Sequence, residues 1–247
     1  MNTSNPTLGA FTNVGIMGAN YGNSSTMTVD GTIHKTGILA VLLALAFGFT
    51  WIGLSHSEVP PSLPLLVGVV GGFVLAMIIC FKPTTAPYLS PLYALVEGFV
   101  LASISYFFEQ RFPGIAVQTA ALTIATVFGM LFAYRTGLIV VNNTFRAVII
   151  GATLTIAVYY LVGMIASFFG LLLPGIGIQG SWLSIGISGV IVVVAAMNLA
   201  LDFDQIATNA GTAPRYMEWY GAFSLMVTIV WLYLSILRLL ADSRSRN

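Results

Sequence analysis

Two carboxylates, Asp202 and Asp204, stand together at the end of a long uncharged run of the sequence. Residues two apart point to different faces of a helix, whereas Asn198, Asp202 and Gln205 are spaced four and three and share one face. Asn198 therefore extends a polar stripe from Asp202 into the apolar run. We expect Asp202 to face the interior of the protein and Asp204 to be a solvated charge near a loop.

A third carboxylate, Glu97, lies near the centre of the apolar segment 88–108. An ionisable group inside a membrane-spanning segment is costly, and it usually faces a partner, water or the interior of the bundle. Two roles are open for Glu97. It either lines a polar path, or it is a buried carboxyl group that forms a local hydrogen bond, for example to Tyr93 one turn earlier.

The last apolar segment carries a polar face that could contact these acids. Its polar residues recur at spacings of four, three, four and three, namely Ser224, Thr228, Trp231, Ser235 and Arg238. We expect this face to turn toward Asp202 and Glu97. The alternative is that the hydroxyl groups bond their own helix backbone and that Arg238 extends its charge to the membrane interface.

Composition indicates what kind of element positions these residues. Of the 247 residues, 57% are hydrophobic and only 7% are charged, whereas a soluble domain carries about 25% charged residues. A helix needs about 20 apolar residues to cross the hydrocarbon layer. Seven runs are long enough, at 36–54, 63–81, 88–108, 115–134, 146–173, 182–201 and 220–240. Because the runs are continuous rather than alternating, we predict an all-α integral membrane protein.

The polar residues outside these runs suggest the domain limits and the orientation. We expect a flexible polar tail over 1–34, a seven-helix transmembrane domain over 35–241 and a short C-terminal tail over 242–247. One side of the membrane has the basic loops, with Lys35, Lys82, Arg135, Arg146 and Arg215, while the loops of the other side hold only Arg111. The positive-inside rule then puts the N-terminus in the cytoplasm and the C-terminus outside. If the last helix fails to cross fully, both ends are cytoplasmic.

Several classes of function are disfavoured. A net charge of +1 implies no nucleic-acid partner, and a single cysteine permits no disulfide within the chain. The sequence GISG at 186–189 matches the GxSG of intramembrane serine proteases, but His34 and His56 both precede it, so no histidine base follows on a later helix. We also find no Cys/His metal cluster and no P-loop, and we expect neither an enzyme nor a cofactor.

The stretches YALVEGFVLASISYFFEQ, LDFDQI and WLYLSILRLL resemble the bacterial branch of the transmembrane Bax inhibitor motif family, over about residues 35 to 240. The resemblance implies a seven-helix bundle whose last helix is central and wrapped by the other six. It further implies a pH-sensitive calcium leak channel gated by two aspartates that share a proton, one at the end of helix six and one on helix seven. A basic residue at the end of helix two would latch the first aspartate.

Carried onto this sequence, the resemblance matches the first aspartate to Asp202, the latch to Lys82 and the second aspartate to Ser235. A serine cannot act as the second carboxylate, so Arg238, one turn further on, becomes a candidate partner of Asp202. Asp202 and Ser235 are 33 residues apart. If the last helix starts at 220, Ser235 lies about 22 Å along it, so whether the two residues meet is open.

We therefore predict a multi-pass membrane protein of the bacterial inner membrane that conducts a cation, with calcium expected and with pH modulation through its intramembrane carboxylates. The alternative is a non-conducting protein that binds and regulates other membrane proteins. A secondary transporter is a weaker third possibility, because an odd number of spans without a visible repeat argues against it. The predicted ion pathway and gate consist of Asp202, Glu97, Ser235, Arg238, Lys82, Asn198 and Asp204.

Overall fold

A computed structural model of the chain describes residues 26–56, 62–171 and 181–246. These residues form seven long α-helices and one short 3-10 turn, and each of the seven is long and apolar enough to cross a membrane. The helices are α2 (Val29–His56), α3 (Ser62–Phe81), α4 (Ala86–Arg111), α5 (Ile115–Arg135), α6 (Asn143–Phe168), α7 (Trp182–Asn209) and α8 (Met217–Arg244), and the turn η1 (Pro83–Thr85) joins α3 to α4. The predicted all-α, seven-span architecture is confirmed.

Some helix ends differ from the prediction. α2 begins at Val29 rather than 36, because the residues before it are fixed by the loop between α7 and α8. The Met27 amide donates to the Ala213 carbonyl at 2.8 Å, and the Gly211 amide donates to the Met27 carbonyl at 2.8 Å. α8 continues to Arg244, so the predicted C-terminal tail begins inside a helix. The predicted tail residues 1–25, and the end of the predicted run at 172–173, lie outside the described residues.

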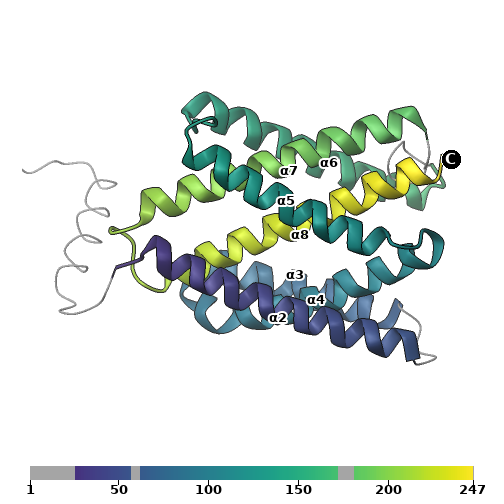
Figure 1. Ribbon diagram of the computed structural model, residues 1–247, viewed down its shortest axis with the longest axis horizontal. Coiled ribbons are helices and arrows are strands. Elements are labelled where there is room, and N and C mark those ends of the chain that lie inside the picture. The colour runs from purple at the N-terminus through teal and green to yellow at the C-terminus, as the bar shows by residue number, and fades with distance from the viewer. Residues whose placement is uncertain (1–25, 57–61, 172–180, 247) are drawn as a thin grey trace, which may run out of the picture.

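The last helix is central, as expected. α8 runs through the middle of the bundle and packs against α2, α4, α5 and α7, while α3 packs chiefly against α4 and α6 against α7 (Figure 1). The expectation of a wrapping by all six helices is therefore only partly met. The side chains of Leu232 and Leu237 on α8 are almost completely buried, because apolar neighbours surround this helix on several sides.

Glycines allow the close packing of α2, α3 and α4. A Cβ atom on Gly98 of α4 would lie 2.6 Å from both the Cβ of Ala46 and the carbonyl oxygen of Leu43 on α2. A Cβ atom on Gly68 of α3 would lie 2.5 Å from the side chain of Val100 on α4. Because only glycine avoids these clashes, small residues fix the contacts of this three-helix group.

The helices alternate in direction, which defines two ends of the bundle. The start of α8 and the end of α7 lie at the end that contains Asp202, called the Asp202 end below. The end of α8 and the start of α7 lie at the opposite end, called the Asp242 end. Since α8 crosses the whole bundle, the first and last described residues lie at opposite ends.

Candidate ion pathway and gate

Asp202 is a buried carboxylate held between two membrane-spanning helices. It lies on α7, and its two oxygens accept hydrogen bonds from α8: Ser224 Oγ donates to Oδ1 at 2.7 Å and Thr228 Oγ1 donates to Oδ2 at 2.5 Å. Ser224 and Thr228 are one helical turn apart and therefore reach the same carboxylate. The expected approach of the polar face of α8 to Asp202 is confirmed for these two residues, which we call the Asp202 clamp.

A small cavity lies beside the Asp202 clamp. Its volume is about 20 Å³, and it is lined by Asp202, Gln205 and Asn209 on α7 together with residues of α8 and Met27. A cavity needs roughly 10–15 Å³ to hold one water molecule, and this one has polar groups to bind it. Asp202 thus has a place for water on the side that leads toward the end of α7.

The hydrogen bonds of the Asp202 clamp are those that an ionised carboxylate can accept. An ionised carboxylate only accepts hydrogen bonds, so it satisfies both hydroxyl donors at once. A protonated carboxyl group carries an O–H donor on one oxygen, which then competes with the hydroxyl hydrogen that it had accepted. The direction of the hydrogen bonds in this clamp therefore depends on the protonation state of the carboxyl group.

Three residues of the predicted gate lie elsewhere. Ser235 donates its hydroxyl to the Trp231 carbonyl at 2.8 Å, about 10 Å further along α8 than Thr228 at 1.5 Å per residue. Arg238 lies over the ring of Tyr160 on α6, 5.6 Å from its centroid, and not against Asp202. Lys82 is exposed at the end of α3, and the ion pairs found in the described part of the chain do not include it.

Ser235, matched to the second aspartate by the resemblance, therefore does not meet Asp202. The residues of α8 opposite Asp202 are Ser224 and Thr228, as their hydrogen bonds show. The resemblance implies a second aspartate opposite the first. In this chain, hydroxyl groups and not a second carboxyl group face Asp202.

Glu97 does not join the Asp202 clamp. It lies on α4 and forms a hydrogen bond with Tyr93, and a Cβ atom on Gly72 of α3 would be 3.0 Å from its Oε1. α8 separates α4 from α7. The expectation that the polar face of α8 also turns toward Glu97 is not met, and the local hydrogen bond to Tyr93 is the one observed.

Asn198 and Asp204 flank Asp202 but contact α6. The Asn198 side-chain amide donates to Thr153 Oγ1 at 2.9 Å, so the polar stripe continues into the α6–α7 contact. Asp204 forms an ion pair with Arg146 at 2.7 Å, with the Arg146 side chain 52% exposed. Asp204 is thus a charge near the loop, as expected, but one that is paired across helices.

A second buried acid, Asp242, was missed by the sequence analysis. Asp242 lies in the last turns of α8, is 1% exposed, and accepts hydrogen bonds from Ser184 Oγ and Ser188 Oγ of α7, both at 2.8 Å. We call these three residues the Asp242 clamp. The signal was present, because Asp242 follows Arg238 by four and continues the four-three spacing of the polar face. The serine of the GISG motif, Ser188, is here a hydrogen-bond donor to this acid.

The two clamps are reciprocal and separated by apolar side chains. In one, an acid of α7 meets two hydroxyl groups of α8; in the other, an acid of α8 meets two hydroxyl groups of α7. Between them the buried side chains of Leu199, Leu232 and Ile236 pack together, and we call these three the apolar plug. Among the described residues no group of three or more acidic, histidine or cysteine side chains is placed to hold a metal ion.

Comparison with known proteins agrees with this architecture. The chain matches the family described as Bax inhibitor 1 like over residues 5–245, which is nearly its whole length. Comparisons with curated proteins and with solved structures give no match. The family match and the seven membrane-spanning helices together show that the chain is a multi-pass membrane protein that belongs to the Bax inhibitor 1-like family.

Proposed function

We propose that this chain is a cation leak channel rather than an enzyme, with calcium as its favoured ion and the α7–α8 contact as its gate. The observation that carries the proposal is the Asp202 clamp: a carboxylate buried at membrane depth, held by two hydroxyl groups and adjacent to a cavity of the size of a water molecule. A buried intramembrane acid is expensive, and it usually marks an ion or proton pathway.

The described conformation corresponds to the closed state in this proposal. The apolar plug is completely packed, with Leu199 and Leu232 at 0% exposure, and a hydrophobic constriction excludes hydrated ions. Opening then requires α8 to move away from α7, which separates the plug residues. Protonation of Asp202 biases that motion because it alters the hydrogen bonds of the Asp202 clamp.

The chemistry of the two clamps supports a hard cation. Calcium prefers oxygen ligands, including carboxylates, carbonyls and water. Each clamp offers one carboxylate and two hydroxyl oxygens, on either side of the apolar plug. A single carboxylate per site favours weak, transient binding, which suits passage of an ion better than storage.

The test is a calcium-flux assay with purified protein in liposomes that contain a calcium indicator. We expect wild-type flux above that of empty vesicles and a changed pH dependence of this flux in Asp202→Asn. The matched control is Asp30→Asn, which neutralises an exposed acid in the first turn of α2 and should behave as the wild type. Wild-type flux equal to that of empty vesicles would end the proposal.

The alternative is a non-conducting protein that binds and regulates other membrane proteins. The continuous apolar plug is the observation that favours it, because nothing polar connects the two clamps through these three side chains. Under this alternative the liposomes stay tight in every variant, and a membrane-protein partner co-purifies in a stoichiometric amount.

We further propose that the Asp202 end faces the cytoplasm of a bacterial inner membrane. The helix ends and loops of that end contain Lys35, Lys82, Arg135, Arg146 and Arg215, and a surplus of basic residues is typical of the cytoplasmic side. Fusions of a periplasm-active reporter enzyme after Arg135 and after Arg111 test this orientation. Activity should appear only with the fusion after Arg111.

A further inference from the structure

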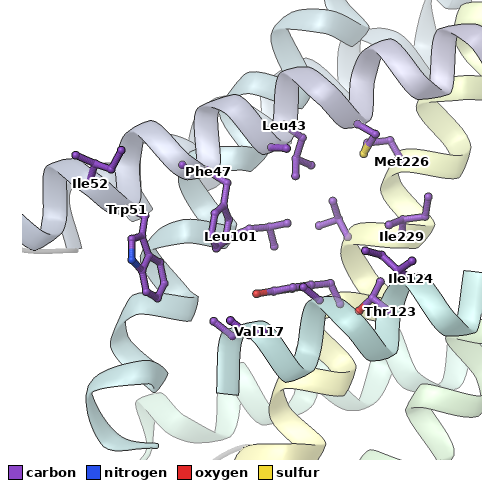
Figure 2. Close-up of a pocket in the computed structure, with 17 residues that line it drawn as sticks. Leu43, Phe47, Trp51, Ile52, Leu101, Val117, Thr123, Ile124, Met226 and Ile229 are labelled. Atoms are coloured by element: carbon purple, nitrogen blue, oxygen red, sulfur yellow. The ribbon is translucent and has the colours of Figure 1, made fainter. Parts of the chain in front are cut away.

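A large apolar groove opens on the side of the bundle between α2 and α5. Its volume is about 650 Å³, and α8 forms its floor with Met226, Ile229, Val230 and Tyr233. Figure 2 shows side chains of α2, such as Leu43 and Phe47, on one side of the groove and Val117 and Ile124 of α5 on the other. This volume lies within the range of ligand pockets, which is roughly 300–1,000 Å³.

Small residues on both walls explain why the groove is hollow. On α2 the lining includes Ala40, Ala44 and Gly48, each four residues from the next, and on α5 it includes Ala116 and Ala120. α2 and α5 both pack against α8 but have no extensive contact with each other. The side chains that would fill the space between the two helices are therefore too short to do so.

The lining is suited to hydrocarbon and not to water. Its two hydroxyl groups already have partners, since Thr123 donates to the Thr119 carbonyl at 2.8 Å and Tyr233 shares a hydrogen bond of 2.7 Å with Ser105. A water molecule needs two to four polar partners to occupy a cavity. An empty groove of this size would also forfeit the dispersion contacts of every side chain that lines it.

The dimensions match one leaflet of a bilayer. The α2 wall extends over the 13 residues from Ala40 to Ile52, or about 18 Å for twelve steps of 1.5 Å. The hydrocarbon core is about 30 Å thick, so one leaflet contributes about 15 Å. The groove begins near the middle of α2 and ends near Trp51, which packs edge-on against Tyr106 at 5.5 Å. Tryptophan and tyrosine are typical of the membrane interface, here at the Asp242 end.

We propose that this groove binds one acyl chain of a phospholipid from the leaflet at the Asp242 end. The terminal methyl group lies against Met226 and Ile229, deep in the bundle, and the headgroup lies beyond Trp51. Met226 lies two residues before Thr228 and Ile229 one residue after it. The bound acyl chain therefore packs against the part of α8 that carries the Asp202 clamp. This site does not depend on whether the protein conducts ions.

The experiment uses the full chain in lipid nanodiscs that contain a phospholipid with a photoreactive diazirine in its acyl chain. After illumination, mass spectrometry of peptides locates the labelled residues. We expect labelling to concentrate on the groove residues of α2, α5 and α8, and to saturate as the proportion of probe lipid rises. Labelling spread evenly over the exposed, lipid-facing residues of α6 would overturn the proposal.

A groove-filling variant sharpens the test. A Cβ atom on Gly48 meets nothing within 4 Å, so Gly48→Leu places a side chain in open space inside the groove. It should lower groove labelling by at least about tenfold, since it displaces several methylene groups of the lipid. The matched control is Gly151→Leu on α6, where a Cβ atom also meets nothing within 4 Å but which lies outside the groove, and its labelling should equal that of the wild type.

A second filling variant guards against misfolding of the first. Ala120→Leu fills the groove from the α5 wall, and both variants are first checked for a monodisperse elution profile and wild-type helicity. Loss of groove labelling in a folded Gly48→Leu or Ala120→Leu protein supports the site. Wild-type labelling in a folded filling variant would refute it.

Discussion

The Asp242 clamp predicts that removing the hydroxyl donors destabilises the protein more than removing the acid that accepts their hydrogen bonds. Asp242→Ala takes away the acid and leaves Ser184 and Ser188, whose hydroxyl groups can bond their own helix backbone. Side-chain hydrogen bonds in membrane proteins are worth about 0.6 kcal/mol on average and up to about 1.7. Loss of the two bonds should therefore lower the free energy of unfolding by about 1–3 kcal/mol.

The complementary change is the double variant Ser184→Ala with Ser188→Ala. It breaks the same two bonds, but it also leaves an acid that is 1% exposed without its donors. Leaving a buried acceptor without its donors adds a desolvation penalty of about 1–3 kcal/mol, because the group stays buried and unpaired. The triple variant combines Asp242→Ala, Ser184→Ala and Ser188→Ala and so has no buried acid left without partners. Its free energy of unfolding should lie within about 0.5 kcal/mol of that of Asp242→Ala.

The assay is reversible unfolding in mixed micelles by titration with an anionic detergent, followed by far-ultraviolet circular dichroism. Ser167→Ala serves as control, since Ser167 is exposed and bonds the Met164 carbonyl of its own helix; it should shift stability by less than about 0.5 kcal/mol. If the double serine variant is no less stable than Asp242→Ala, Asp242 is not enclosed by these serines and the reasoning fails.

Three further predictions concern the gate and the helix ends. Thr228→Asp places a second carboxyl group against Asp202, so the pair should share a proton and give calcium flux a steep pH dependence between about pH 5 and 8. Ser235→Asp places its carboxyl group about 10 Å further along α8 and should not have this effect. Equal pH profiles of the two variants in the liposome assay would contradict the geometry. Leu232→Ser introduces a polar group into the apolar plug and should raise the calcium leak at least about tenfold if the barrier falls by ~1.4 kcal/mol, whereas Leu45→Ser at an exposed position of α2 should leave it unchanged. Glu218→Ala removes the acceptor of Lys35 and of the Thr28 amide and should cost about 3–5 kcal/mol of unfolding free energy. Asp204→Ala, whose partner Arg146 is half exposed, should cost less than about 1 kcal/mol.

The membrane-spanning helices could be predicted from the sequence because hydrophobic length alone decides them. The contact between Asp202 and the polar face of α8 could also be predicted. The spacing of Ser224 and Thr228 defines the polar face of α8, and Asp202 lies on the polar face of α7. The partner position along α8 could not be predicted. It depends on how α7 and α8 pack in three dimensions, which places Ser224 and Thr228 opposite Asp202 and leaves Ser235 about 10 Å further along α8.

Asp242 was overlooked for a different physical reason. An acid five residues before the last residue of the sequence resembles part of a solvated tail. Its burial depends on tertiary contacts that local sequence does not encode. Here Arg246 lies over the Trp182 ring at 3.6 Å and Arg244 donates to the Pro113 carbonyl at 2.9 Å. These contacts continue the helix to Arg244 and fix its end. The position of Glu97 beside Gly72 of α3 is a tertiary contact that the local sequence likewise does not reveal.

The reciprocal arrangement of the two clamps restricts how α8 can move. A sliding of α8 along its own axis by one turn would rupture both clamps together and expose two acids in the same step. A tilt that pivots about one clamp breaks only the hydrogen bonds of the other. In the proposed channel, the clamp that breaks first would determine at which end of the bundle α7 and α8 separate.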